Sequence, residues 1–385
     1  MQFDFDKLIE RRGTHCVKWD KPMADDVIPM WVADMDFEVA PAITQALRQR
    51  VEHGVFGYVA VPDEFFQAAT HWFERRHQWS ICQDWIQYTI GVVPALSAIV
   101  RAFTRPDEKV IIMTPVYNCF FSAVKNNDCL LVESPLIYDD ATYRIDFDDL
   151  ERKTQDADVK MLILCNPHNP ACRVWTVDEL KRVGDICRRN GVVVLSDEIH
   201  CEFVYPGYHY TPFASIEGHQ DITITCVSPS KAFNIAGLQT ALIVTANREW
   251  RERIDRVLCA NEVNMLNPFG VEALIAAYNH GDAWMDALNE YIYGNYQLLC
   301  HTFARVLPQL TVTRLEGTYL AWVDCRKLGM TSERLTQHLL DNAHVMVNSG
   351  AMYGITGDGF IRINLATQRS RLNEALHRMV ATLTL

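Results

Sequence analysis

Six short apolar runs alternate with segments of helical pattern between residues 109 and 245, and this alternation restricts the possible folds most strongly. The runs lie at 109–115, 130–135, 160–167, 192–196, 222–227 and 240–245. A near-continuous apolar run such as 192–196 is typical of a strand that is covered on both faces. Segment 176–190 predicts a helix, because Thr176 and Glu179 form a capping-box pattern and Gly191 follows its end. Strands separated by helices predict an α/β fold with a mostly parallel sheet.

The rest of the chain predicts a second, smaller unit. The pattern is helical from 248 to 307, and strand-like pieces at 319–324 and 360–365 then flank a helix near 332–342. The first 45 residues are irregular and contain Pro22, Pro29 and Pro41. We therefore expect a large domain at 46–275, in which the sheet lies between helices. A small α+β domain would be formed by 276–385 together with the N-terminal segment 1–45.

Composition excludes several classes of protein. The formal net charge is −12, which disfavours nucleic-acid and anionic-membrane partners. No run of about 18 apolar residues predicts a membrane span, and the acidic N-terminus lacks the apolar core of a signal peptide. The twelve cysteines are scattered without a C-x-x-C pair, which predicts free thiols and a cytoplasmic location. Metal-protease, P-loop and dinucleotide motifs are absent, so we expect no metal or nucleotide site.

Two residues that follow predicted strands suggest cofactor chemistry. Lys231 lies between small residues in Ser228-Pro229-Ser230-Lys231. A buried lysine is costly unless it is neutralised, for example by a Schiff base with an aldehyde cofactor, and the two serines could then donate to a phosphate. Asp197 ends the run 192–196, where ligands bind in open α/β sheets. The alternatives are a surface-loop lysine and a helix cap or ion pair.

Three further positions fit a phosphorylated cofactor and an amino-acid substrate. Asn169 follows another strand in a turn-rich loop, where its amide could contact a cofactor oxygen, although turn chemistry also explains it. Gly91-Val92-Val93 opens a helix whose free N–H groups could bind phosphate, or it is an ordinary helix start. Arg362 lies within an apolar strand-like run, which suits either a substrate carboxylate or a structural ion pair.

In this order, these residues resemble the pyridoxal-phosphate (PLP) enzymes of the aspartate-aminotransferase fold, over nearly the whole chain. Five longer motifs narrow the resemblance to the MalY/PatB-type cystathionine β-lyases, also called cysteine C–S lyases. These motifs are WVADMDF at 31–37, VFGY at 55–58, SDEIH at 196–200, SPSKAFNIAGL at 228–238 and EGTYL at 316–320. Most aminotransferases of the fold have a tyrosine at the position of His200 and often an arginine at that of Gln239, and both changes fit the lyase subgroup.

The resemblance implies a role for each matching residue. Lys231 would bind PLP covalently, Asp197 would pair with its ring nitrogen, and Arg362 would hold the substrate carboxylate. Contacts with the cofactor or substrate would come from Val92, Val93, Tyr117, Asn169, His200, Ser228, Ser230 and Asp34, with Tyr58 reaching the phosphate of a neighbouring subunit in a homodimer. The usual Asn-Pro-Thr-Gly is Asn169-Pro170-Ala171-Cys172 here. If that glycine position requires φ > 0, Cys172 carries strain of roughly 1–2 kcal/mol.

The activity that the resemblance implies is β-elimination. Lys231 would remove the Cα proton of a cysteine conjugate such as L-cystathionine, and the thiolate would leave with pyruvate and ammonia as the other products. One alternative is an aminotransferase on the same fold. Another, from a different class, is a regulatory protein that binds PLP and acts through a partner. The pocket for the thiol half would draw on 31–37 and on residues near 349–356.

Overall fold

A seven-stranded sheet forms the larger part of the molecule, whose computed structural model describes residues 3–21 and 24–384. The strand order is β2-β10-β9-β8-β7-β3-β4, and only β10 runs antiparallel to its neighbours. This confirms the expected mostly parallel sheet. The bounds are β2 (Ile86–Thr89), β3 (Lys109–Ile112), β4 (Leu130–Glu133), β7 (Val159–Cys165), β8 (Val193–Asp197), β9 (Thr223–Val227) and β10 (Ala241–Val244).

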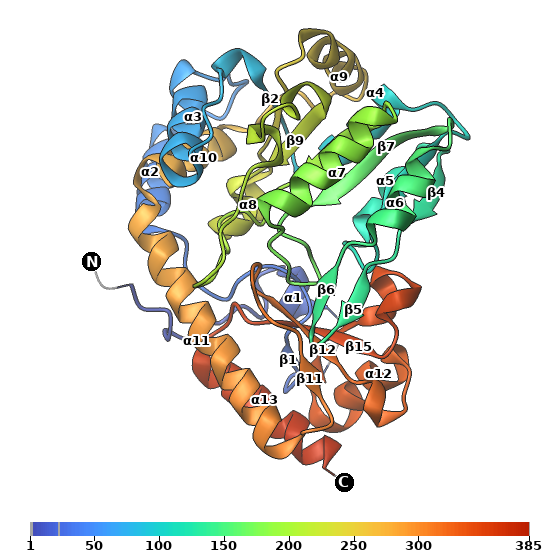
Figure 1. The fold of residues 1–385 in the computed structure, drawn as a ribbon. Coiled ribbons are helices and arrows are strands. Elements are labelled where there is room, and N and C mark those ends of the chain that lie inside the picture. The colour runs from blue at the N-terminus through green and yellow to red at the C-terminus, as the bar shows by residue number, and fades with distance from the viewer. Residues whose placement is uncertain (1–2, 22–23, 385) are drawn as a thin grey trace.

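Helices cover both faces of this sheet (Figure 1). Along β7, Met161 and Ile163 pack with one apolar cluster while Leu162 and Leu164 pack with the other, so the strand is apolar on both sides. The first cluster includes α4 (Val92–Phe103), α5 (Cys119–Lys125) and α9 (Arg248–Ala260). The second includes α3 (Asp63–His77), α7 (Val177–Arg189) and α10 (Pro268–His280). The remaining helices of this part are α2 (Pro41–His53), α6 (Phe147–Thr154) and α8 (Pro229–Ala232).

The capping box predicted for the helix after residue 176 is confirmed. The Thr176 hydroxyl accepts from the Glu179 N–H, and the Glu179 carboxylate accepts from the Thr176 N–H, so both ends of the box are formed. Gly191 follows with φ of 68°, a conformation that glycine adopts without strain. The helix is the crossover that connects β7 to the neighbouring parallel strand β8. Asp197 therefore lies at the C-terminal end of a central strand of the sheet.

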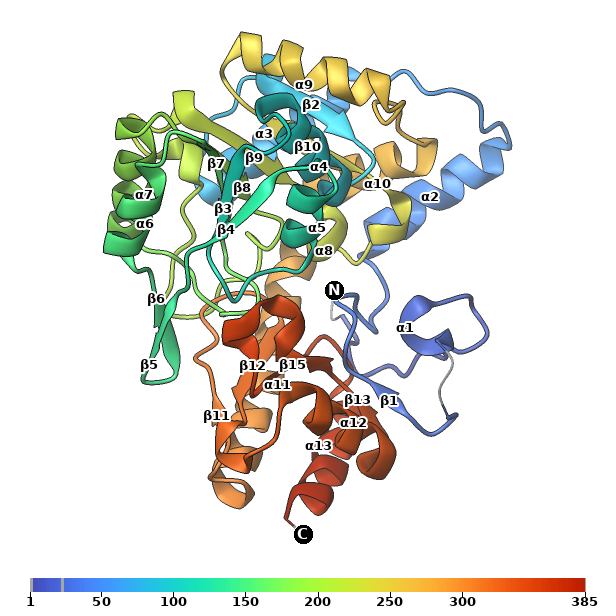
Figure 2. The ribbon, with the colours of Figure 1, turned by 90° about the vertical axis from the view of Figure 1, so that its right-hand side faces the viewer.

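A second sheet of four strands organises the other part (Figure 2). Its order is β11 (Thr311–Val312), β12 (Leu320–Asp324), β15 (Phe360–Asn364) and β14 (Asn348–Ser349), with all pairs antiparallel. The helices α12 (Ser332–Ala343) and α13 (Arg369–Leu383) belong to this part, and α11 (Asp282–Val306) reaches it from the larger part. The expected smaller α+β unit is therefore present.

The N-terminal segment joins this second part. It contains α1 (Val17–Asp20), and β1 (Ile28–Pro29) pairs in parallel with β13 (Val345–Met346). Of its three prolines, Pro22 lies outside the described residues. The expected domain limit between 275 and 276 falls inside α10. The domain limits stay a prediction. The hairpin of β5 (Ile137–Asp139) and β6 (Thr142–Arg144) was not predicted from the sequence.

Candidate functional site

A cavity of about 430 Å³ lies where the ends of the main strands face the second sheet. It is partly open to solvent, and its lining is mainly apolar with a few charged groups. Nine of the residues singled out from the sequence line it, namely Val92, Val93, Tyr117, Asn169, Asp197, His200, Ser230, Lys231 and Arg362. Segments far apart in the sequence thus meet at one site, at the edge of the sheet where α/β folds bind ligands.

Lys231 lies on the short helix α8, directly after β9. Its amine donates to the Ala33 carbonyl at 2.6 Å. Burial lowers the pKa of Lys231 to about 8, Arg362 acts in the same direction, and Asp34 and Asp197 oppose them. A lysine with this pKa is in part an uncharged amine near neutral pH, which is the nucleophilic and basic form.

Asp197 ends β8 and is 2% exposed. Burial raises its pKa to about 7, and the neighbouring Glu198 adds to this, while the Ile199 N–H and Lys231 oppose it. That N–H donates to the carboxylate at 3.2 Å, and the described residues place no basic side chain within ion-pair distance. A buried carboxylate in this state would gain most from a cationic partner inside the cavity.

His200 follows Asp197 by three residues and is 3% exposed. Burial lowers its pKa well below the usual value, with Lys231 and Arg362 acting in the same direction, so the ring is neutral. Its Nδ1 is buried and has no hydrogen-bond partner within the described ranges. The Tyr319 ring packs edge-on against it at 5.7 Å between centroids, which fixes the plane of the imidazole.

Arg362 lies on β15 and is 4% exposed. It donates to the Asn169 side-chain oxygen at 3.2 Å and to the Trp31 carbonyl at 3.0 Å, and it lies over the Tyr353 ring at 4.9 Å. Its Nε has no partner, and in residues 3–21 and 24–384 no carboxylate pairs with it. The structural ion pair is therefore excluded for these residues, and a buried guanidinium remains available to an anion in the cavity.

The N-terminus of α4 lies at another end of the cavity. Gly91 is its N-cap, and Val92 and Val93 are the first helical residues, whose N–H groups have no intrahelical acceptor. The Thr240 hydroxyl is buried nearby in the lining and has no hydrogen-bond partner in the described part of the chain. Free N–H groups and hydroxyls at a helix start of this length are suited to a phosphate.

Comparison with known proteins gives the family. The family described as aminotransferase class I and II matches residues 25–379. The chain belongs to this family. It is 40% identical to the cystathionine beta-lyase PatB of Bacillus subtilis over 99% of this chain and all of PatB, and 34% identical to the protein MalY of Escherichia coli over 98% of each. The crystal structure of cystalysin from Treponema denticola, which contains a PLP cofactor, matches with a TM-score of 0.97 and 37% identity over 100% of this chain and 99% of that one. The resemblance to the MalY/PatB-type enzymes is confirmed.

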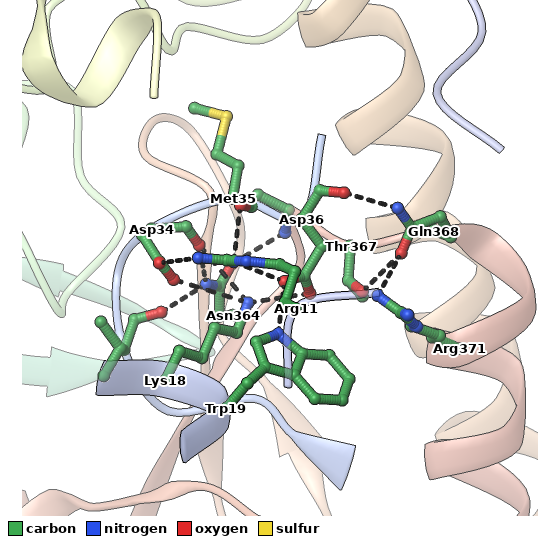
Figure 3. Close-up of polar contacts among 12 residues, drawn as sticks. Arg11, Lys18, Trp19, Asp34, Met35, Asp36, Asn364, Thr367, Gln368 and Arg371 are labelled. Atoms are coloured by element: carbon green, nitrogen blue, oxygen red, sulfur yellow. Dashed lines mark hydrogen bonds and ion pairs between the residues drawn. The ribbon is translucent and has the colours of Figure 1, made fainter. Parts of the chain in front are cut away.

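Three residues singled out from the sequence lie outside the cavity lining. The Ser228 hydroxyl caps α8 and donates to the Thr240 carbonyl at 2.7 Å, so it is already engaged. The Asp34 carboxylate pairs with Arg11 at 2.7 Å (Figure 3). The Tyr58 side chain is 97% exposed on the surface. Direct contacts of these three with cofactor or substrate stay predictions.

The replaced glycine position behaves as expected. Cys172 has φ of 61°, a conformation that costs a non-glycine residue about 1–2 kcal/mol. The residue is fully buried, and its thiol donates to the carbonyls of Pro170 and Leu320, both at 3.2 Å. These bonds hold the loop on its path, so Asn169 still meets Arg362.

Several lining residues were missed from the sequence. They include Cys119, Asn348, Met352 and Tyr353. The residues near 349–356 were expected to contribute, but no residue type or spacing identified these individually. Tyr319 lies in the EGTYL motif, and its hydroxyl donates to the Ala33 carbonyl at 2.8 Å. That contact depends on tertiary structure alone.

One group of potential metal ligands lies elsewhere. His77, Cys201 and Glu202 bring three ligand atoms within 4.8 Å of one another. Glu202 already accepts from the Trp72 indole at 2.6 Å and contacts His77 at 2.7 Å. These contacts engage Glu202 Oε1, whereas Glu202 Oε2 is buried, lies 3.7 Å from Arg76 Nε and has no hydrogen-bond partner among the described residues. Among the described helices, none is long and apolar enough to span a membrane.

Proposed function

We propose that this protein is a PLP-dependent C–S β-lyase that converts L-cystathionine or a related cysteine conjugate to pyruvate, ammonia and a thiol such as homocysteine. One observation carries the proposal: Arg362, buried and without a carboxylate partner among the residues that the structure describes, faces the same cavity as Lys231 and Asp197. A cation for an α-carboxylate, an amine of lowered pKa and a buried carboxylate are the groups that amino-acid chemistry on PLP requires. The named activities of PatB and cystalysin support the thiol-releasing reaction.

The residues present fit PLP. The unpartnered Nδ1 of His200 and the unpartnered hydroxyl of Thr240 offer polar contacts inside the lining. Burial raises the pKa of Asp197 although the nearby Lys231 lowers it, and a protonated ring nitrogen would supply a further cation to stabilise the charged form. Lys231 would hold the cofactor aldehyde, the start of α4 with Ser230 would hold its phosphate, and Tyr117 would lie against its ring.

Bound PLP would accept the electron pair that the substrate Cα releases when its proton is lost. Arg362 binds the substrate carboxylate, and its contact with Asn169 fixes the orientation of the guanidinium. The uncharged amine of Lys231 takes the Cα proton and can return it to the departing sulfur as general acid. The mainly apolar lining reduces competition from water for these charged groups.

The test is a product assay without a keto acid. We expect the holoenzyme to release pyruvate and free thiol in equal amounts from L-cystathionine. If product formation requires 2-oxoglutarate and an amino group is transferred to it, the protein is an aminotransferase. If PLP binds but no substrate turns over, the protein is better explained as a regulatory protein.

We also propose a homodimer with shared active sites and a location in the cytoplasm. Tyr58 and its neighbours Val55 and Phe56 are 97%, 62% and 52% exposed, an apolar surface of the kind that subunit contacts cover. All twelve cysteines are free thiols, which suits a reducing compartment. Sedimentation would reveal the dimer. The Tyr58→Phe variant should then bind PLP more weakly, because the hydroxyl would contact the partner's cofactor.

A further inference from the structure

Residues 31–37, here called the strap, have no regular secondary structure, and the first three of them, Trp31, Val32 and Ala33, line the cavity. Backbone carbonyls in such a segment need donors from outside a helix or sheet. Each of the seven strap carbonyls accepts a hydrogen bond from a side chain elsewhere in the chain. The donors, from residue 31 to residue 37, come from Asn348, Arg362, Asn364, Lys231, Tyr319, Lys18, Arg11, Asn234 and Gln368.

A buried charged cluster holds the outer side of the strap (Figure 3). Asp36 is 1% exposed and accepts from Arg11 at 2.7 Å, from Lys18 at 2.9 Å and from the Trp19 indole at 2.8 Å. Arg11 also donates to Asp34 at 2.7 Å and to the Met35 carbonyl at 2.9 Å. Two cations and two carboxylates balance, so removing one leaves a buried charge without its partner.

The inner side of the strap meets the two residues on which the proposed function rests. The Ala33 carbonyl accepts from the Lys231 amine at 2.6 Å, and the Trp31 carbonyl accepts from Arg362 at 3.0 Å. The strap is therefore the one described segment whose carbonyls accept from both of these side chains. A shift of its backbone would move the acceptors for both together.

We propose that Arg11 and Asp36 are positioning residues, which fix the strap so that Arg362 and Lys231 are held ready for the substrate. This inference rests on the proposed function, because it assigns its effect to those two groups. Neither Arg11 nor Asp36 lines the cavity, so their action on the substrate is through the strap. Misplacing a binding group by about 1 Å can cost on the order of 100-fold in reactivity.

The test measures binding of L-alanine to the holoenzyme by absorbance titration, since L-alanine has no leaving group on Cβ. In Arg11→Met we expect the dissociation constant to rise about tenfold or more, and Arg11→Lys should restore most of the affinity because the charge returns. The matched control is Arg75→Met, which breaks an ion pair with Asp282 at 2.8 Å away from the strap. It should leave L-alanine binding unchanged.

A second variant approaches the strap from β15. Asn364 donates from one amide to the carbonyls of Val32 and Asp34, at 2.6 and 2.7 Å, and Asn364→Asp removes these donors in an almost identical shape. It should weaken L-alanine binding in the same direction, and it decides the question if Arg11→Met does not fold.

Unchanged L-alanine affinity in folded Arg11→Met and Asn364→Asp would overturn the inference, even if both variants unfold at lower temperature. A different result would contradict the proposed function, namely an Arg362→Lys variant that binds L-alanine as well as the wild type does. If Arg362→Lys weakens binding while the strap variants do not, only the positioning role is lost.

Discussion

The two sides of the cavity differ in the kind of charge they provide. The main-sheet side contributes Lys231, on α8 directly after β9, and Asp197, at the end of β8, whose pKa values burial moves to about 8 and about 7. The second sheet contributes Arg362, a guanidinium whose forked donors match the geometry of a carboxylate. Groups that titrate near neutral pH suit proton transfer, whereas a guanidinium of this geometry suits recognition. The chemistry and the binding of the substrate are thus divided between two sheets.

The largest expected effect concerns the main-sheet side. Lys231→Ala removes the amine that takes the Cα proton, and we expect pyruvate formation to fall by about 1,000-fold or more. The measurement is the turnover rate with PLP content verified by absorbance. Turnover close to that of the wild type would mean that another group removes the Cα proton. The main-sheet side would then not carry the proton transfer.

The second effect concerns the opposite side. Arg362→Leu removes the only cation on β15 that faces the cavity, and kcat/KM should fall about 100-fold, mainly through KM. Arg362→Lys keeps the charge but loses the two-pronged geometry, so it should recover only part of this loss. A variant whose kcat falls while KM stays constant would contradict a role in recognition.

A third prediction follows from the raised pKa of Asp197. The native state favours the protonated form, so its stability contribution is present at low pH and is lost as pH rises through about 7. In cofactor-free protein, Asp197→Asn should therefore increase the free energy of unfolding at pH 8 by on the order of 3 kcal/mol, and by little near pH 4.

The measurement is urea unfolding at both pH values. Asp148→Asn is the control, because the Asp148 side chain is 98% exposed. Removing its charge should change the free energy of unfolding at neither pH. Holoenzyme carrying Asp197→Asn should lose most of its activity despite the gain in stability. A loss of stability at pH 8 would mean that the carboxylate has a stabilising partner in the cofactor-free protein.

The smallest effect is expected where the two parts of the molecule meet. The Cys172 carbonyl accepts from the N–H groups of Glu316 and Gly317, both at 3.1 Å, and its φ is 61°. Glycine tolerates this conformation and alanine does not, so Cys172→Gly should be more stable than Cys172→Ala by about 1 kcal/mol. Thermal unfolding of the pair measures it, and a more stable alanine variant would place the strain elsewhere.

The sequence was informative where a side chain follows a buried strand. Asp197 and Lys231 could be found because parallel strands end at one edge of a sheet, and ligands bind there. Each of the six runs predicted between 109 and 245 overlaps a strand of the main sheet. The first strand, β2, was missed because its four residues are only partly apolar.

The contacts of the strap could not be predicted in the same way. Those on its inner side join residues more than 190 positions apart, such as Ala33 and Lys231, and depend on how the two parts of the molecule pack. The pairing of the Asp34 carboxylate with Arg11, 23 positions away, was not predicted either, and a contact of Asp34 with the substrate stays a prediction. A motif shows that residues belong together, but only the fold shows which way a side chain points.

The most direct test of this division is the exchange of the Cα proton of L-alanine with solvent deuterium, followed by NMR in the holoenzyme, Lys231→Ala and Arg362→Lys. We expect no measurable exchange in Lys231→Ala at any concentration of L-alanine, because the amine that takes the proton is missing. In Arg362→Lys we expect exchange near the wild-type rate once L-alanine is saturating, with a higher half-saturation concentration. Exchange at the wild-type rate in Lys231→Ala would contradict the account.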